Sequence, residues 1–70
     1  MCGIFGYIGD KPAYNEVYDG LKKLEYRGYD SCGISVIDRG KFKTIKKVGG
    51  PETLKGKCKS KSTIGIGHTR

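Results

Sequence analysis

The sequence has little of several residue types whose abundance would indicate particular classes of protein. It contains no tryptophan, two prolines, one histidine and three cysteines among 70 residues. Three cysteines are too few for a disulfide framework, and their gaps of 30 and 26 residues match no short zinc-binding motif. No apolar run approaches the roughly 18 residues that a membrane helix needs. We therefore expect reduced cysteines, no metal and no membrane association.

The chain is also short, and its beginning lacks the features of a targeting segment. Seventy residues allow at most one small domain. The first 30 residues carry neither a basic leader nor an unbroken apolar stretch of signal-peptide length. We expect a cytoplasmic protein whose residues 1–70 form one unit without an internal linker.

Positive charge is concentrated in the second half of the chain. Residues 1–30 carry four Lys or Arg against five Asp or Glu, whereas residues 31–70 carry ten against two, so the net charge of +7 divides into −1 and +8. Such a half can mark a nucleic-acid surface. Aromatic residues that could stack bases are absent beside these lysines except Phe42, which strand alternation would bury. We interpret the lysines as a solvated face and expect no nucleic-acid partner.

The hydrophobic pattern of the first half predicts a strand and then a helix. Residues 3–8 are apolar apart from glycine, which is typical of a strand covered on both faces. Asp10 can cap a helix that has Pro12 in its first turn. Gly20 would weaken that helix unless something packs closely against it. The face of this helix that we expect to be buried carries Ala13, Val17, Leu21 and Leu24.

The second half predicts a β-hairpin, a short helix and a last strand. Residues 32–37 and 41–48 have strand composition, and Asp38-Arg39-Gly40 between them is typical of a tight turn. Gly49-Gly50-Pro51 breaks the chain before a short helix at 52–58, and a strand follows at 62–67. The order strand, helix, hairpin, short helix, strand is an α+β arrangement.

Cys2 is the first candidate for chemistry. Removal of Met1 would leave a thiol and a free α-amine on the same residue. The thiolate is the nucleophilic form of cysteine, and an α-amine with a pKa of about 7.7–8.0 is partly neutral at pH 7. The amine can therefore take the thiol proton, directly or through one water, as the base does in a two-residue nucleophile and base pair.

Three segments give this cysteine a context: Met1-Cys2-Gly3-Ile4-Phe5-Gly6, Leu24-Glu25-Tyr26-Arg27-Gly28-Tyr29-Asp30-Ser31 and Gly67-His68-Thr69-Arg70. Together they resemble the start of the glutaminase domain of the glutamine–fructose-6-phosphate aminotransferase (glucosamine-6-phosphate synthase) family of class II glutamine amidotransferases. The resemblance covers essentially all of residues 1–70. Cys-Gly-Ile is shared by the whole class, whereas Glu-Tyr-Arg-Gly-Tyr-Asp-Ser is typical of the sugar-phosphate branch.

The resemblance implies an N-terminal nucleophile hydrolase fold, an αββα sandwich of which this chain holds an incomplete piece. The family continues after Arg70 with Trp-Ala-Thr-His-Gly, later supplies an Asn-Gly oxyanion hole, and then carries sugar isomerase domains. Without an oxyanion donor the rate falls roughly a hundred- to a thousandfold, so we expect the piece alone to be inactive. The resemblance implies no cofactor and a homodimeric parent.

The resemblance also implies the reaction and its residues. Cys2 would attack the side-chain amide of L-glutamine, form a glutamyl thioester and release ammonia, which converts fructose 6-phosphate to glucosamine 6-phosphate. Arg70 matches the arginine that pairs with the glutamine α-carboxylate, a task that suits the guanidinium fork. Thr69 and Arg27 are candidates for supporting roles, Arg27 near the nucleophile loop. An Arg27–Asp30 ion pair that only shapes the turn is the alternative.

Other interpretations remain open at this point. The chain could feed ammonia to another acceptor, as the purine and asparagine branches of the class do, or it could be a small basic nucleic-acid-binding module that uses residues 41–61. His68 suggests a Cys–His dyad, but the N-terminal amine already serves as the base, so we do not assign it one. Cys32 fits as a small buried hydrophobic residue.

Overall fold

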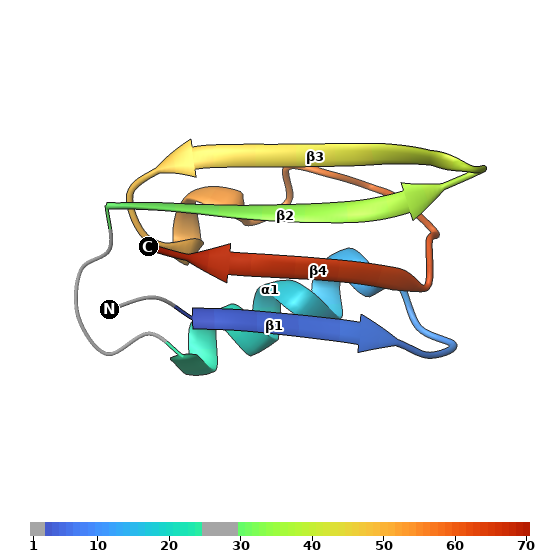
Figure 1. Ribbon diagram of the computed structural model, residues 1–70, viewed down its shortest axis with the longest axis horizontal. Helices are drawn as coiled ribbons and strands as arrows, with labels where there is room; N and C mark the ends of the chain where they lie inside the picture. Colours follow the sequence, from blue (N-terminus) through green and yellow to red (C-terminus); the bar gives the residue numbers. More distant parts are fainter. Residues whose placement is uncertain (1–2, 25–29) are drawn as a thin grey trace.

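The elements form an α+β unit in which four antiparallel strands carry one helix on one face (Figure 1). The computed structural model describes residues 3–24 and 30–70. The sheet has the order β1-β4-β2-β3, so the last strand lies between the first two. In chain order the elements are β1 (Gly3–Ile8), α1 (Ala13–Leu24), β2 (Ser31–Asp38), β3 (Lys41–Val48), the 3₁₀ turn η1 (Pro51–Leu54) and β4 (Ile64–Thr69).

The hairpin confirms the turn predicted at residues 38–40. β2 pairs with β3 from Ser31↔Val48 to Asp38↔Lys41, and the two loop residues have positive φ, 55° at Arg39 and 77° at Gly40. Two consecutive positive φ values are the signature of the type I′ turn, whose twist matches that of the flanking strands. Glycine adopts this conformation without steric cost, whereas Arg39 is an uncommon residue for it.

Helix α1 buries the face that its periodicity predicts. Ala13, Val17 and Leu21 are buried against the sheet, and Leu24 packs at the edge of the same cluster. The prediction for Gly20 is also confirmed, because a Cβ there would lie 2.5 Å from the Phe5 ring. The predicted cap at Asp10 is wrong. The helix begins only at Ala13, where the Pro12 carbonyl accepts a hydrogen bond from the Glu16 amide (3.4 Å) and Ala13 donates to Ser62 O (2.7 Å).

The bounds of the second helix and of the last strand also differ from prediction. The helix expected at 52–58 is the 3₁₀ turn η1 alone, since Gly56 has φ of 67° and cannot continue a right-handed helix. The last strand runs from Ile64 to Thr69 because it pairs with a neighbour on each side, β1 and β2. Both partners hold it in the extended conformation to its last residue.

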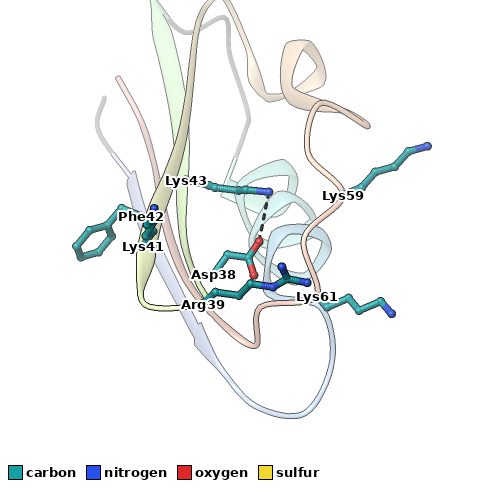
Figure 2. A pocket seen from close by; sticks show the side chains of 7 residues that line it. All are labelled: Asp38, Arg39, Lys41, Phe42, Lys43, Lys59 and Lys61. Carbon is teal, nitrogen blue, oxygen red and sulfur yellow. Dashed lines mark ion pairs between the residues drawn. The ribbon is translucent and has the colours of Figure 1, made fainter.

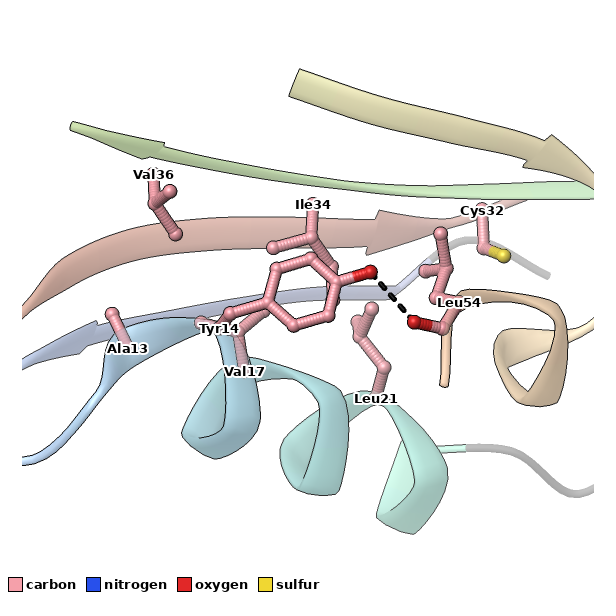
Figure 3. Packing of buried hydrophobic residues seen from close by; sticks show 8 residues of the cluster. All are labelled: Ala13, Tyr14, Val17, Leu21, Cys32, Ile34, Val36 and Leu54. Atoms are coloured by element: carbon pink, nitrogen blue, oxygen red, sulfur yellow. Dashed lines mark hydrogen bonds between the residues drawn. The ribbon is translucent and has the colours of Figure 1, made fainter. Parts of the chain in front are cut away.

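The core lies between α1, η1 and one face of the sheet (Figure 3). The Tyr14 hydroxyl donates a hydrogen bond of 2.6 Å to the Leu54 carbonyl, which ties the helix to η1. Burial raises the pKa of Tyr14 to about 12, and nearby Cys58, Cys32 and Tyr18 add to the shift. The buried apolar cluster consists of Ala13, Tyr14, Val17, Leu21, Cys32, Ile34, Val36 and Leu54.

The opposite face of the sheet is apolar and exposed. We expected strand 3–8 to be covered on both faces, which is wrong for this chain: Ile4 is 77% exposed and Ile8 82%. Phe42 was expected to be buried and is 76% exposed. Its register partner is Ile37, which places both on the face away from the helix. All the large exposed hydrophobic residues of the described chain share this face, which we call the open face: Ile4, Ile8, Ile37, Phe42, Val48, Ile64 and Ile66.

Among the described residues, no helix has the length and apolar character needed to cross a membrane.

Candidate active site

The start of β1 and the end of β4 lie side by side at one end of the sheet, at the left in Figure 1. Gly3 is the register partner of Thr69, and Thr69 also pairs with Cys32 of β2. Arg70 continues this ladder: its amide donates to Ser31 O (2.8 Å), and its carbonyl accepts from the amides of Asp30 (2.6 Å) and Ser31 (3.3 Å). The first and last segments of the resemblance are thus neighbours in space.

Two of the four predicted site residues, Cys2 and Arg27, lie outside the described residues. The other two, Thr69 and Arg70, are consecutive at the end of β4. Residue 3, which follows the candidate nucleophile in sequence, is the cross-strand neighbour of Thr69.

Thr69 is a buried residue with an unsatisfied hydroxyl. It is 1% exposed, and its Oγ1 has no hydrogen-bond partner within residues 3–24 and 30–70. A Cβ on Gly3 would lie 3.1 Å from this Oγ1 and 3.1 Å from Leu24 Cδ1, so glycine is what lets the start of β1 pack this closely. A buried polar atom without a partner costs roughly 1–3 kcal/mol and needs an explanation.

Arg70 combines a fixed main chain with a solvent-exposed side chain. Its backbone forms the hydrogen bonds to residues 30 and 31 described above, and its side chain is exposed. A guanidinium that stands in water on a fixed backbone can form two parallel bonds with an incoming carboxylate. This geometry is compatible with the predicted carboxylate-binding role.

His68 lies on the open face, one position before Thr69, and sequence reasoning missed what surrounds it. It is the register partner of Gly33, whose other partner is Lys46. A Cβ on Gly33 would lie 2.9 Å from His68 Nε2, so the imidazole occupies the space that a larger residue would fill. A shallow hollow of about 280 Å³ opens beside it. The signal that could have indicated this hollow is a glycine inside a predicted strand.

The remaining cysteines are not part of this site. Cys32 is buried, as predicted; its Sγ donates to Gly50 O at 3.3 Å and lies 3.5 Å from Thr53 Oγ1. Cys58 packs at the edge of the core. Within the described ranges there is no group of three or more His, Cys, Asp or Glu side chains that could hold a metal ion.

The chain is similar over its whole length to curated aminotransferases from distant organisms. It is 48% identical to the glutamine–fructose-6-phosphate aminotransferase (isomerizing) of Synechocystis and 47% identical to that of Gloeobacter violaceus, each across 100% of this chain. It is 49% identical to the protein of the same name from Methanocaldococcus jannaschii across 97% of this chain. No protein-family model matches the chain.

The match concerns one region of much longer proteins. This chain spans 12% of the Synechocystis and Gloeobacter relatives and 6% of the Methanocaldococcus relative. In these relatives the matching part is the N-terminal region. Nearly half of the aligned positions are identical in each of the three relatives. Over its length, the chain therefore matches the N-terminal region of the glutamine–fructose-6-phosphate aminotransferases.

Proposed function

We propose that this chain provides the nucleophile and the carboxylate-binding arginine of a glutaminase, whose ammonia converts fructose 6-phosphate to glucosamine 6-phosphate. Glutamine and fructose 6-phosphate are the two compounds that the names of its relatives contain. The observation that carries the proposal is the pairing of Gly3 with Thr69, which brings the residue after Cys2 beside the residue before Arg70. The proposal requires Cys2 to lie close enough to Arg70 for both to contact one glutamine.

The thiol of Cys2 carries out the first half of the reaction. Once Met1 is removed, the α-amine of Cys2 accepts the thiol proton and the thiolate attacks the side-chain carbonyl carbon of glutamine. A sulfur–carbon bond forms and the carbonyl becomes a tetrahedral oxyanion. When the oxyanion collapses, the carbon–nitrogen bond breaks, and the α-ammonium gives its proton to the departing nitrogen, which leaves as ammonia. The product left on the chain is a glutamyl thioester.

Water completes the cycle. The neutral α-amine takes a proton from a water molecule, which attacks the thioester carbon. The sulfur–carbon bond then breaks, glutamate leaves, and the proton returns to the thiol. The donors that stabilise the two oxyanions are expected beyond Arg70, so these 70 residues alone are inactive in this proposal.

Arg70 supplies substrate affinity. Its guanidinium pairs with the α-carboxylate of glutamine, which lies at the far end of the substrate from the reacting amide. Thr69 supports the start of β1 through its buried side chain, which lies against Gly3. Arg27 is proposed to support the segment that carries the nucleophile.

The open face supports the proposal that this sheet is part of a larger domain. A sheet face that exposes seven large hydrophobic residues requires a cover in a soluble protein, since patches of this kind mark contacts. We assign it to the middle of an αββα sandwich, where a second sheet of the longer protein packs against it. A cytoplasmic location and a homodimeric parent belong to the same proposal.

A chimera tests the function. Residues 1–70 of this chain replace the matching N-terminal residues of the Synechocystis relative, and ammonia release from glutamine is measured. The chimera should be active, and Cys2→Ala should reduce its activity to background while Cys58→Ala leaves it near the parent rate. Equal activity in the Cys2→Ala chimera would remove the nucleophile from the proposal.

A further inference from the structure

A cationic cavity lies at the end of the sheet opposite to Thr69 and Arg70. Its volume is about 740 Å³, and it opens between the tip of the β2–β3 hairpin and the extended segment that precedes β4 (Figure 2). Residues far apart in sequence line it: Asp38, Arg39, Lys41, Phe42, Lys43, Lys59 and Lys61. We call this the hairpin cavity.

The charges of the hairpin cavity do not balance. Five cationic side chains and one carboxylate line it, an excess of four positive charges. The carboxylate of Asp38 is engaged by Lys43, whose Nζ lies 3.2 Å from Oδ2. Like charges gathered around one concavity repel one another, and the potential they create attracts an anion. A multiply charged anion would relieve that repulsion.

The wall that carries Lys59 and Lys61 is held by its main chain. Ser60, between them, is buried, and its hydroxyl oxygen accepts a hydrogen bond from the Ser62 amide (3.0 Å). The carbonyl of Ser62 accepts from the Ala13 amide (2.7 Å) and that of Thr63 from the Gly9 amide (3.1 Å). The segment is therefore fastened to α1 and to the end of β1, while Lys59 and Lys61 remain exposed. A ligand that binds here would therefore need to order little of the main chain.

The opposite wall is held equally well. Arg39 and Lys41 flank Gly40 in the type I′ turn, whose positive φ values fix the direction of the chain at the tip. Phe42 is the one aromatic residue among those lining the cavity, and Figure 2 shows its ring pointing away from Lys59 and Lys61. The cavity thus has cationic residues on both walls without a ring between them on which a base could stack, although Figure 2 shows the ammonium groups of Lys59 and Lys61 extended away from the hairpin.

We propose that the hairpin cavity is a binding site for a small compound that carries several phosphate groups in a row. Lysines hold phosphate as compact point charges, and the excess of four charges suits an oligophosphate better than a single carboxylate. The volume lies within the range of small-molecule sites, roughly 300–1,000 Å³. The site is remote from the proposed glutamine site, so an occupant would act on the protein separately from glutamine.

The test uses inorganic tripolyphosphate and the 70-residue chain, with binding followed by calorimetry and by residue-resolved amide NMR shifts. The test variant is Lys59→Gln with Lys61→Gln. Its matched control is Lys46→Gln with Lys47→Gln, which removes the same charge from exposed positions of β3 outside the cavity. Lysine-to-glutamine changes at exposed positions leave the core untouched, so both variants should keep the fold.

The site predicts saturable binding with shifts concentrated at residues 38–43 and 57–62. The test variant should bind about tenfold or more weakly, and the control should stay within about twofold of the parent. Equal weakening in both variants would overturn the proposal, because it would show attraction by net charge alone. So would failure of tripolyphosphate to bind at low salt, or tighter binding of a single-stranded oligonucleotide with shifts outside the cavity.

Discussion

Replacing Thr69 by valine should stabilise the chain, the opposite of what most core substitutions do. Valine keeps the branched shape of threonine and its preference for strands, but it removes the hydroxyl that lies buried without a partner among the described residues. A buried polar atom without a hydrogen bond costs roughly 1–3 kcal/mol. The added methyl would meet Gly3 and Leu24, which present no polar side-chain group. We expect a gain of about 1–2 kcal/mol in the free energy of unfolding.

Urea unfolding of the 70-residue chain, followed by far-ultraviolet circular dichroism, measures this gain. For a chain of this size, each kcal/mol corresponds to a shift of about 4–8 °C in the melting temperature. Thr69→Ser is the matched control, because it keeps the hydroxyl and loses the methyl, and it should destabilise. In the chimera, Thr69→Val should lower glutaminase activity if the hydroxyl supports the start of β1. A loss of about 1 kcal/mol or more in Thr69→Val would refute the reasoning, because it would show that the hydroxyl has a partner.

Three further predictions concern the core, the open face and the proposed ion pair between Arg70 and the carboxylate of glutamine. The pKa of Tyr14 is raised from 10.0 to about 12, so the stability that its protonated hydroxyl contributes is complete below pH 10 and is lost as the pH rises through 12. Tyr14→Phe should therefore make the free energy of unfolding less dependent on pH in that window. An unchanged pH dependence in this variant would contradict the shift. A thiol introduced by Ile66→Cys should react with maleimide at least about a hundredfold more slowly in the chimera than one introduced by Lys47→Cys, because the proposed second sheet would cover the open face. Equal rates would argue against the sandwich. Arg70→Lys in the chimera should raise the Michaelis constant for glutamine by about ten- to a hundredfold with little change in turnover, and an unchanged constant would separate Arg70 from the substrate.

Local patterns predicted the elements well. The hairpin follows from Asp38-Arg39-Gly40 between two strand-like runs, and helix α1 follows from the spacing of Val17 and Leu21. In both cases the information lies in neighbouring residues, because a turn or a helix face is built within a few positions. The predicted cap at Asp10 is wrong because the helix begins at Ala13, where a tertiary hydrogen bond from the Ala13 amide to Ser62 O holds its start.

Long-range properties were not predictable in the same way. The apolar run 3–8 was expected to be covered on both faces, yet Ile4 and Ile8 are exposed. The composition of a strand indicates that its faces are to be buried, but it does not indicate which part of a protein buries them. The central position of β4 makes Gly3 and Thr69 partners across almost the full length of the chain, and periodicity contains no such information. The hairpin cavity was missed for the same reason, because its lysines come from segments that meet only in the fold.

Of the four candidate site residues, the structure describes the positions of two and tests the role of none. The resemblance indicated Thr69 and Arg70. In the structure Thr69 is the last residue of β4, beside the start of β1, and Arg70 follows it directly. The resemblance did not indicate that the hydroxyl of Thr69 would be buried without a partner among the described residues, since that depends on how closely Gly3 and Leu24 pack. The roles of Cys2, Arg27, Thr69 and Arg70 all remain predictions.

Covalent trapping tests the central claim most directly, namely that the thiol of Cys2 attacks the side chain of glutamine. The chimera is incubated with a glutamine analogue that carries an electrophile in place of the side-chain amide, and the adduct is located by intact mass and peptide mapping. The account predicts one adduct per chain, on a Cys2 that has lost Met1, with slower formation in the Arg70→Ala chimera and protection by glutamine. An adduct on Cys32 or Cys58, or none in a chimera that releases ammonia from glutamine, would contradict it.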